Sequence, residues 1–182
     1  MPEGKIKEHG VGVTLSPLSK EYHGDIYTYL LFKADNTAFQ KYLKEIEGQK
    51  STHEGQTSTH CCCDIICFAL QKSLDQHKSK RKITICLVEL KGGKQDYISK
   101  ASKQILETRT WLEEGIRRCI DEKGINNINI TWQALIISRS SLSKETARNR
   151  EDYRKMAAKF NKADYTCDNM INLVEYMSGK RK

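Results

Sequence analysis

The chain has 182 residues, of which 38% are hydrophobic, so it is long enough for one compact domain and rather short for two. Its net charge of +8 favours polyanionic partners, nucleic acid above all, because Lys and Arg displace the counterions that surround phosphates. No stretch approaches the roughly 18 to 20 apolar residues that cross a bilayer, and residues 1–10 contain no apolar signal-peptide core. We expect a soluble, cytoplasmic protein with one domain over residues 1–182 and no membrane partner.

The seven cysteines argue against a secreted disulfide framework. Four of them, Cys61, Cys62, Cys63 and Cys67, lie close together beside apolar residues. A disulfide framework spaces its cysteines differently, so reduced and mostly buried thiols are the better interpretation. Zinc is disfavoured as well, since adjacent cysteines on a strand point to opposite faces and no second Cys or His pair completes a tetrahedron.

The first third of the chain predicts two strands and a helix. Residues 11–17 and 25–33 are rich in Val, Ile, Tyr and Leu, and the turn-prone sequence EYHG precedes the second of them. We therefore expect an N-terminal β-hairpin over residues 11–33. Asp35 and Asn36 form a typical N-cap pair, and apolar residues follow at helical spacing as far as Gly48, which predicts a short helix.

Two apolar runs of strand length follow a polar loop. They are CCCDIICFAL at 61–70 and ITICLVEL at 83–90, and a polar connection separates them. Continuous apolar runs are typical of strands that are covered on both faces. Each run is interrupted by one acidic residue, Asp64 in the first and Glu89 in the second.

The second half begins with a long amphipathic pattern. Apolar residues recur at three- and four-residue intervals from about Gln95 to Glu122, and Gly124 then ends the expected helix. Residues 128–138 predict another strand, and residues 143–178 have a basic, helical composition. The order of elements predicts an α/β fold with a central mixed β-sheet flanked by helices.

The two acidic interruptions predict a metal site. An ionised carboxylate is costly to bury unless something compensates its charge, and a bound cation is one such compensation. If the two apolar strands form a hairpin, Asp64 and Glu89 lie at the same end of the sheet. Carboxylate and carbonyl oxygens, completed by water, are the ligands that Mg²⁺ prefers.

The residues around Glu89 suit hydrolysis of a phosphodiester. Lys91 is two positions further along the strand and projects to the same face, where its ammonium can orient water or stabilise charge on a phosphate. Gly92 and Gly93 leave the neighbouring backbone open to a substrate. Gln104 lies on the long helix, and its amide reaches the site if that helix packs on the sheet; the alternative is an exposed polar residue.

These residues resemble the PD-(D/E)xK, or restriction-endonuclease-like, nuclease superfamily. The matching pieces are CCCDIICF with Asp64, VELKGG with Glu89 and Lys91, and KASKQILET with Gln104, and the resemblance covers a core of about residues 36–138. It implies a restriction-endonuclease-like core in which Asp64, Glu89 and the Leu90 carbonyl bind Mg²⁺ or Mn²⁺ while Lys91 assists the attacking water. Cys63 stands where the family motif has proline.

Some members of that superfamily add an acidic residue from the first helix. The resemblance offers three candidates for this role, Glu45, Glu47 and Glu54, and nothing in the sequence chooses among them.

Basic residues provide candidate contacts to a phosphate backbone, although such residues are usually a solvated helix face. Those expected to bind nucleic acid are Lys94, Arg139, Lys144, Arg148, Arg150, Arg154 and Lys155, with Lys159 and Lys162 in the same cluster.

We expect a metal-dependent nuclease that acts on DNA rather than RNA, as an endonuclease rather than an exonuclease. The first alternative is a non-catalytic nucleic-acid-binding or assembly module with the same fold. The second is a small basic interaction protein whose acidic strand residues are structural. A homodimer or larger assembly stays open.

Overall fold

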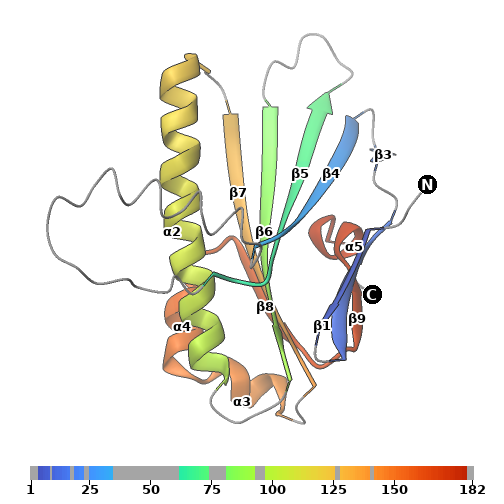
Figure 1. Ribbon diagram of the computed structural model, residues 1–182, viewed down its shortest axis with the longest axis vertical. Coiled ribbons are helices and arrows are strands. Elements are labelled where there is room, and N and C mark those ends of the chain that lie inside the picture. Colours follow the sequence, from blue (N-terminus) through green and yellow to red (C-terminus); the bar gives the residue numbers. More distant parts are fainter. Residues whose placement is uncertain are drawn as a thin grey trace, which may run out of the picture.

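The computed structural model of the chain describes residues 4–8, 10–16, 19–22, 25–34, 62–73, 81–92, 97–125, 128–139 and 142–179. These ranges form an α/β structure with two mixed β-sheets and four helices (Figure 1). None of the helices in these ranges is long and apolar enough to cross a membrane.

A six-stranded sheet is the central layer of the molecule (Figure 1). The first three pairs of neighbouring strands are antiparallel, and the last two pairs are parallel. In spatial order the strands are β3 (Ser19–Tyr22), β4 (Asp25–Lys33), β5 (Ile65–Ser73), β6 (Arg81–Lys91), β7 (Ile128–Ser138) and β8 (Lys162–Thr166). Because β6, β7 and β8 are parallel, their carboxyl ends meet at one edge of the sheet, where α/β proteins commonly bind ligands.

Helices cover one face of this sheet. The long helix α2 (Tyr97–Lys123) connects β6 to β7, and α4 (Glu151–Ala157) packs beside it (Figure 1). The long helix ends at Gly124, whose φ of +58° suits the residue that follows a helix, as the sequence predicts. Its buried face begins with Tyr97, Ile98, Ala101 and Ile105.

A smaller sheet and a short helix cover the opposite face. This sheet contains β1 (Gly4–Glu8), β2 (Val11–Leu15) and β9 (Met170–Asn172), and α5 (Leu173–Met177) follows it directly. Alternate residues of β6 face the two sides, with Ile85 and Leu87 toward α2 and Cys86 and Val88 toward the small sheet. The two-sided cover confirms the interpretation of the continuous apolar runs.

The expected N-terminal hairpin over residues 11–33 is wrong. The strand at Val11–Leu15 pairs with β1 and β9 in the small sheet, whereas Asp25–Lys33 pairs with β3 and β5 in the central sheet. Val11, Val13 and Leu15 are buried against the far face of the central sheet. That packing gives β2 a partner from the other end of the chain, which local turn signals do not reveal.

The expected helical region at 143–178 is only partly helical. After α3 (Lys144–Arg148) and α4, the chain forms β8 and β9 before it returns to a helix in α5. Tyr165 and Thr166 are buried in β8, which adds to the central sheet beside β7. Pairing with a preformed strand therefore overrides helical composition here. The helix expected after Asn36 lies outside the described residues.

Candidate active site

Two carboxylates meet at the start of β5. The sequence predicts Asp64 within a strand, but in the structure Asp64 directly precedes β5 and so lies at the end of the strand. Its backbone N–H donates a hydrogen bond of 3.1 Å to Glu89 Oε2, and its own Oδ2 accepts one of 2.6 Å from the Leu90 N–H. The antiparallel pairing of β5 with β6 produces this contact, because Ile65 is opposite Val88.

Lys91 connects this pair to the long helix. Its ammonium forms an ion pair with Glu89 Oε1 and donates a hydrogen bond of 3.1 Å to Gln104 Oε1. The Glu89 side chain is fully buried, while that of Lys91 keeps 18% of its surface exposed. Glu89 and Lys91 therefore share the face of β6 that α2 covers, as their spacing predicts.

The long helix also holds the chain just before Asp64. Gln104 Nε2 donates a hydrogen bond of 3.0 Å to the Cys62 carbonyl, and Thr108 Oγ1 accepts one of 2.8 Å from the Cys63 N–H. The Thr108 hydroxyl in turn donates to the Gln104 carbonyl, at 2.8 Å. Gln104 is 9% exposed, so its alternative interpretation as a surface residue is wrong.

Sequence reasoning missed Thr108. It lies one helical turn after Gln104 and is fully buried, so both side chains point to the same side of α2. The signal that was available is a hydroxyl residue four positions after a candidate site residue, within the apolar stripe of an amphipathic helix.

Burial makes the Glu89 carboxylate electrostatically unfavourable. Desolvation, helped by the nearby negative charge of Asp64, raises the pKa of Glu89 from its usual 4.5 to about 8, against the opposing effect of Lys91. A cation beside both carboxylates would favour their ionised forms. The raised pKa therefore fits a site that a positive ion completes.

The Leu90 carbonyl is oriented toward the side of β6 on which Asp64 lies. Within a strand, the N–H and C=O of one residue face the same neighbouring strand, and these directions alternate along the chain. The Leu90 N–H bonds Asp64, whereas the Lys91 carbonyl accepts a hydrogen bond of 3.1 Å from Arg139 N on the β7 side. The Leu90 carbonyl consequently faces the Asp64 side, as the family resemblance implies for a metal ligand.

The oxygen atoms of Asp64, Glu89 and Leu90 suit a hard cation. The described ranges contain no group of three or more His, Cys, Asp or Glu side chains arranged to hold a metal. Asp64, Glu89 and the Leu90 carbonyl supply two carboxylates and one carbonyl, and Mg²⁺ commonly uses one or two carboxylates while keeping several waters. The candidate acids Glu45, Glu47 and Glu54 lie outside the described residues.

The described thiols near Asp64 are poorly suited to bind a soft metal. The Cys63 thiol donates to the Ile65 carbonyl at 3.4 Å, and burial raises its pKa well above its usual value. Cys62, Cys67 and Cys86 are buried, in agreement with the expected buried thiols. Because the thiolate is the form that binds zinc, a raised pKa works against that metal.

The basic residues expected to contact nucleic acid do not form one surface in the described parts of the structure. Arg139 follows β7, and its guanidinium lies against Gly10 in the turn of the small sheet, on the opposite face from Lys91. Arg148 forms an ion pair of 3.2 Å with Asp164, and Lys155 forms one of 2.7 Å with Glu151.

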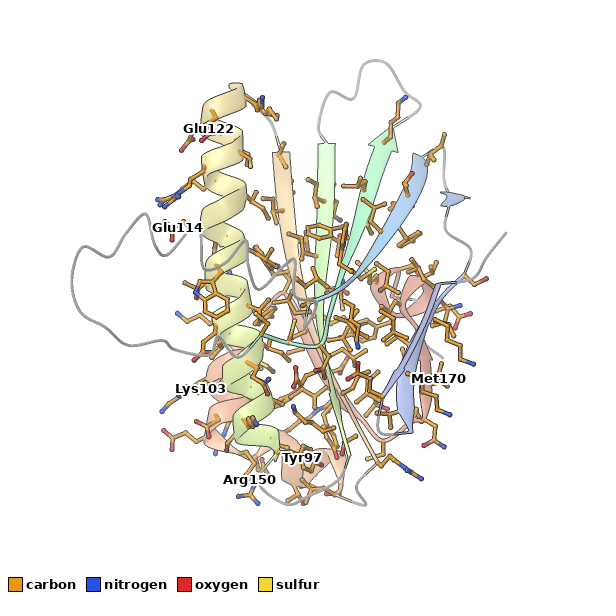
Figure 2. All side chains as sticks on the ribbon, in the orientation of Figure 1. Tyr97, Lys103, Glu114, Glu122, Arg150 and Met170 are labelled. Carbon is orange, nitrogen blue, oxygen red and sulfur yellow. The ribbon has the colours of Figure 1, made fainter. Side chains whose placement is uncertain are left out.

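The remaining basic candidates lie around the start of α4. Arg154 donates a hydrogen bond of 2.9 Å to the Asn149 carbonyl, and Arg150 is exposed directly before the helix. Figure 2 shows Arg150 at the same end of the molecule as Tyr97, the first residue of α2. Lys94 and the side chain of Lys144 lie outside the described residues.

Comparison with known proteins gives no matching family model, no matching curated protein and no matching solved structure.

Proposed function

We propose that this protein is a divalent-metal-dependent nuclease whose catalytic residues are Asp64, Glu89 and Lys91. The observation that supports this most directly is the reciprocal contact of Asp64 with Glu89 and Leu90, which gathers two carboxylates and a carbonyl beside an ammonium group. A structural role alone does not require an acid as buried as Glu89.

Each residue has a defined task in this proposal. Asp64, Glu89 and the Leu90 carbonyl hold Mg²⁺ or Mn²⁺. The cation supplies Lewis-acid chemistry, favouring deprotonation of water and neutralising charge on the phosphate. With the cation bound, Glu89 would be one of its ligands, and the Lys91 ammonium would orient the attacking water or stabilise negative charge on the phosphate oxygens. Gln104 keeps Lys91 in place and fixes the chain at Cys62.

The order of the elements adds support. The Asp64 segment leads into β5, β6 carries Glu89 and Lys91, and α2 with Gln104 then returns the chain to β7. That is the order implied by the PD-(D/E)xK resemblance, and we propose a restriction-endonuclease-like core on this basis. The net charge of +8 favours a polyanionic substrate. We propose DNA as this substrate, and internal cleavage rather than trimming from the ends.

The test is cleavage of single- and double-stranded DNA and RNA by the wild type and Lys91→Ala, each with Mg²⁺, Mn²⁺ or EDTA. We expect cleavage by the wild type with a metal, and none with EDTA or in the variant. Linear and circular DNA substrates separate internal from terminal cleavage. Cleavage that persists in EDTA and in Lys91→Ala would overturn the proposal.

One observation favours the alternative, a non-catalytic nucleic-acid-binding module. Lys91 is already engaged by Glu89 and Gln104, so one of the two carboxylates has a cationic partner without a metal. Calorimetric titration with Mn²⁺ separates the two functions. Binding by the wild type that is lost in Asp64→Asn supports the nuclease, whereas nucleic-acid binding without metal binding or cleavage supports the alternative.

A further inference from the structure

A cavity separate from the candidate active site lies on the side of α2 that faces α4. It has a volume of about 590 Å³, within the usual range for small-molecule sites, and lies between α2, the start of β7 and the chain that follows α4. Its lining includes Arg109, Arg117, Ile120, Trp132, Lys159 and Asn161. None of the residues proposed for catalysis contributes to it.

Arg109 is the organised part of this cavity. Its guanidinium carbon lies 5.2 Å from the ring centre of Trp132 and 5.1 Å from that of Phe160, so two aromatic rings hold it. Glu113 Oε2 is 3.5 Å from Arg109 Nε, while Arg109 Nη1 is buried with no hydrogen-bond partner in the described parts of the chain. The fixed guanidinium therefore places a positive charge in the wall of the cavity, and that charge attracts an anion nearby.

Two further cations lie at the rim. Arg117 and Lys159 are exposed, and neither forms an ion pair within the described ranges. With Arg109 they give three positive charges against the single negative charge of Glu113. The electrostatic character of the cavity therefore favours a ligand that carries negative charge.

Apart from Asn161, the rest of the lining is apolar. Ile116, Ile120 and Ile130 are partly exposed there, so the cavity offers apolar side chains from α2 and β7 beside its cations. Asn161 Oδ1 accepts a hydrogen bond of 2.9 Å from the backbone N–H of Trp132. The side-chain nitrogen Nδ2 of Asn161 can therefore donate to a ligand. A flat apolar group joined to an anion fits this combination.

We infer that this cavity binds a phosphate-bearing nucleoside unit, with the base against the isoleucines and the phosphate at Arg117 and Lys159. The unit comes either from a free mononucleotide or from a nucleic-acid strand. The strand source rests on the proposed nuclease function. Arg150, directly before α4, lies at the same end of the molecule as Tyr97 (Figure 2), and Lys159, just after α4, lines the cavity, so a strand could contact both.

Tryptophan fluorescence tests this site without relying on cleavage. The chain has two tryptophans, so Trp111→Phe leaves Trp132, in the cavity wall, as the single reporter. This protein is titrated in EDTA with thymidine monophosphate, with a short oligothymidylate and with thymidine. We expect a saturable change with at least one phosphate-bearing ligand, and at least tenfold weaker binding of thymidine.

The matched variants are Arg117→Glu with Lys159→Glu, and Lys123→Glu as a control on the same helix outside the cavity. We expect the double variant to weaken binding at least tenfold and the control to leave it nearly unchanged. Binding of the mononucleotide identifies a free nucleotide as a source, and binding of the oligonucleotide alone identifies a strand. No saturable change, or equal affinities in the double variant and the control, would overturn the inference.

The outcome is separable from that of the proposed function. Saturable binding at Trp132 in a protein that never cleaves nucleic acid would retain the cavity and reject the nuclease. Metal-dependent cleavage with no ligand response at Trp132 would support the nuclease and reject the binding cavity.

Discussion

Asp64 Oδ2 lies 2.6 Å from the backbone nitrogen of Leu90, which belongs to a strand 26 positions further along the chain. The same aspartate donates its own N–H to the Glu89 carboxylate. The entry to β5 is therefore fixed to the end of β6 by the residues that we propose to hold a metal ion. Substitutions here affect both the fold and the chemistry, so a loss of activity has to be compared with a measurement of binding or stability.

Replacing Lys91 by Met removes the ammonium and keeps most of the side-chain length. We expect the cleavage rate to fall about 100-fold or more, because charge stabilisation in a buried site is often worth that much. Glu89 loses its ion-pair partner but can take up a proton, so the fold should persist. Gel-based cleavage assays measure the rate, and filter binding in EDTA should show near-normal affinity for DNA. Equal losses of binding and cleavage would instead indicate misfolding.

Glu89 makes stability depend on pH in a defined direction. Its pKa is raised from 4.5 to about 8, so between these values the folded state binds more protons than the unfolded state. The free energy of unfolding contributed by this group is greatest below about pH 4.5, decreases as the pH rises, and is lost above about pH 8.

The substitution Glu89→Gln removes this titration while keeping the shape of the side chain. Thermal unfolding in EDTA at several values between pH 5 and 8 compares the two proteins. We expect the Tm of the wild type to decrease with pH more steeply than that of the variant. Parallel curves would show that Glu89 does not titrate with a raised pKa.

Thr108→Val tests how α2 holds the site. The substitution leaves the buried Cys63 N–H without its acceptor and should lower the free energy of unfolding by about 1 to 3 kcal/mol. Thr110→Val is a matched control, because the Thr110 hydroxyl donates similarly to Leu106 but is exposed. Urea denaturation measures both. A loss in Thr110→Val as large as that in Thr108→Val would contradict this role for Thr108.

Gly12→Ala tests the packing of the small sheet. A Cβ at Gly12 would overlap the carbonyl oxygen of Ile6 on the neighbouring strand, so β1 would have to move. We expect a loss of about 1 to 3 kcal/mol, as for other overpacked sites. Gly4→Ala is the control, since its Cβ would lie at an ordinary 3.5 Å from Leu15 Cβ. Similar stabilities of the two variants, measured by urea denaturation, would show that β1 adjusts freely.

Local patterns were sufficient for the elements whose partners are also local. The helix that ends before Gly124 and the strand Ile128–Ser138 agree with their sequence patterns, and β5 and β6 pair as the hairpin that would bring Asp64 and Glu89 together. Helical periodicity and continuous apolar runs reflect burial directly, so they can be read from the sequence.

Elements with distant partners were predicted poorly. The strand Val11–Leu15 pairs with Met170–Asn172 rather than with the next strand in the sequence, and Lys162–Thr166 extends the central sheet instead of continuing a helix. For Lys162–Thr166, the free energy gained by pairing with the central sheet outweighs helical propensity, whereas for Val11–Leu15 the strand was predicted correctly and only its partner was wrong. No short window of sequence contains that information.

The sequence by itself determined which residues are chemically unusual. Acids at 64 and 89 interrupt apolar runs, and that alone indicated a compensated site, because buried charge is costly. Only the tertiary structure decided how the site is held. It placed Gln104 and Thr108 as the link between α2 and the chain at Cys62 and Cys63, and it directed Arg139 to the other face. It also gathered Arg109, Trp132 and Phe160 around a cavity away from the site. These relationships depend on the packing of segments far apart in the chain, which residue spacing along the sequence does not specify.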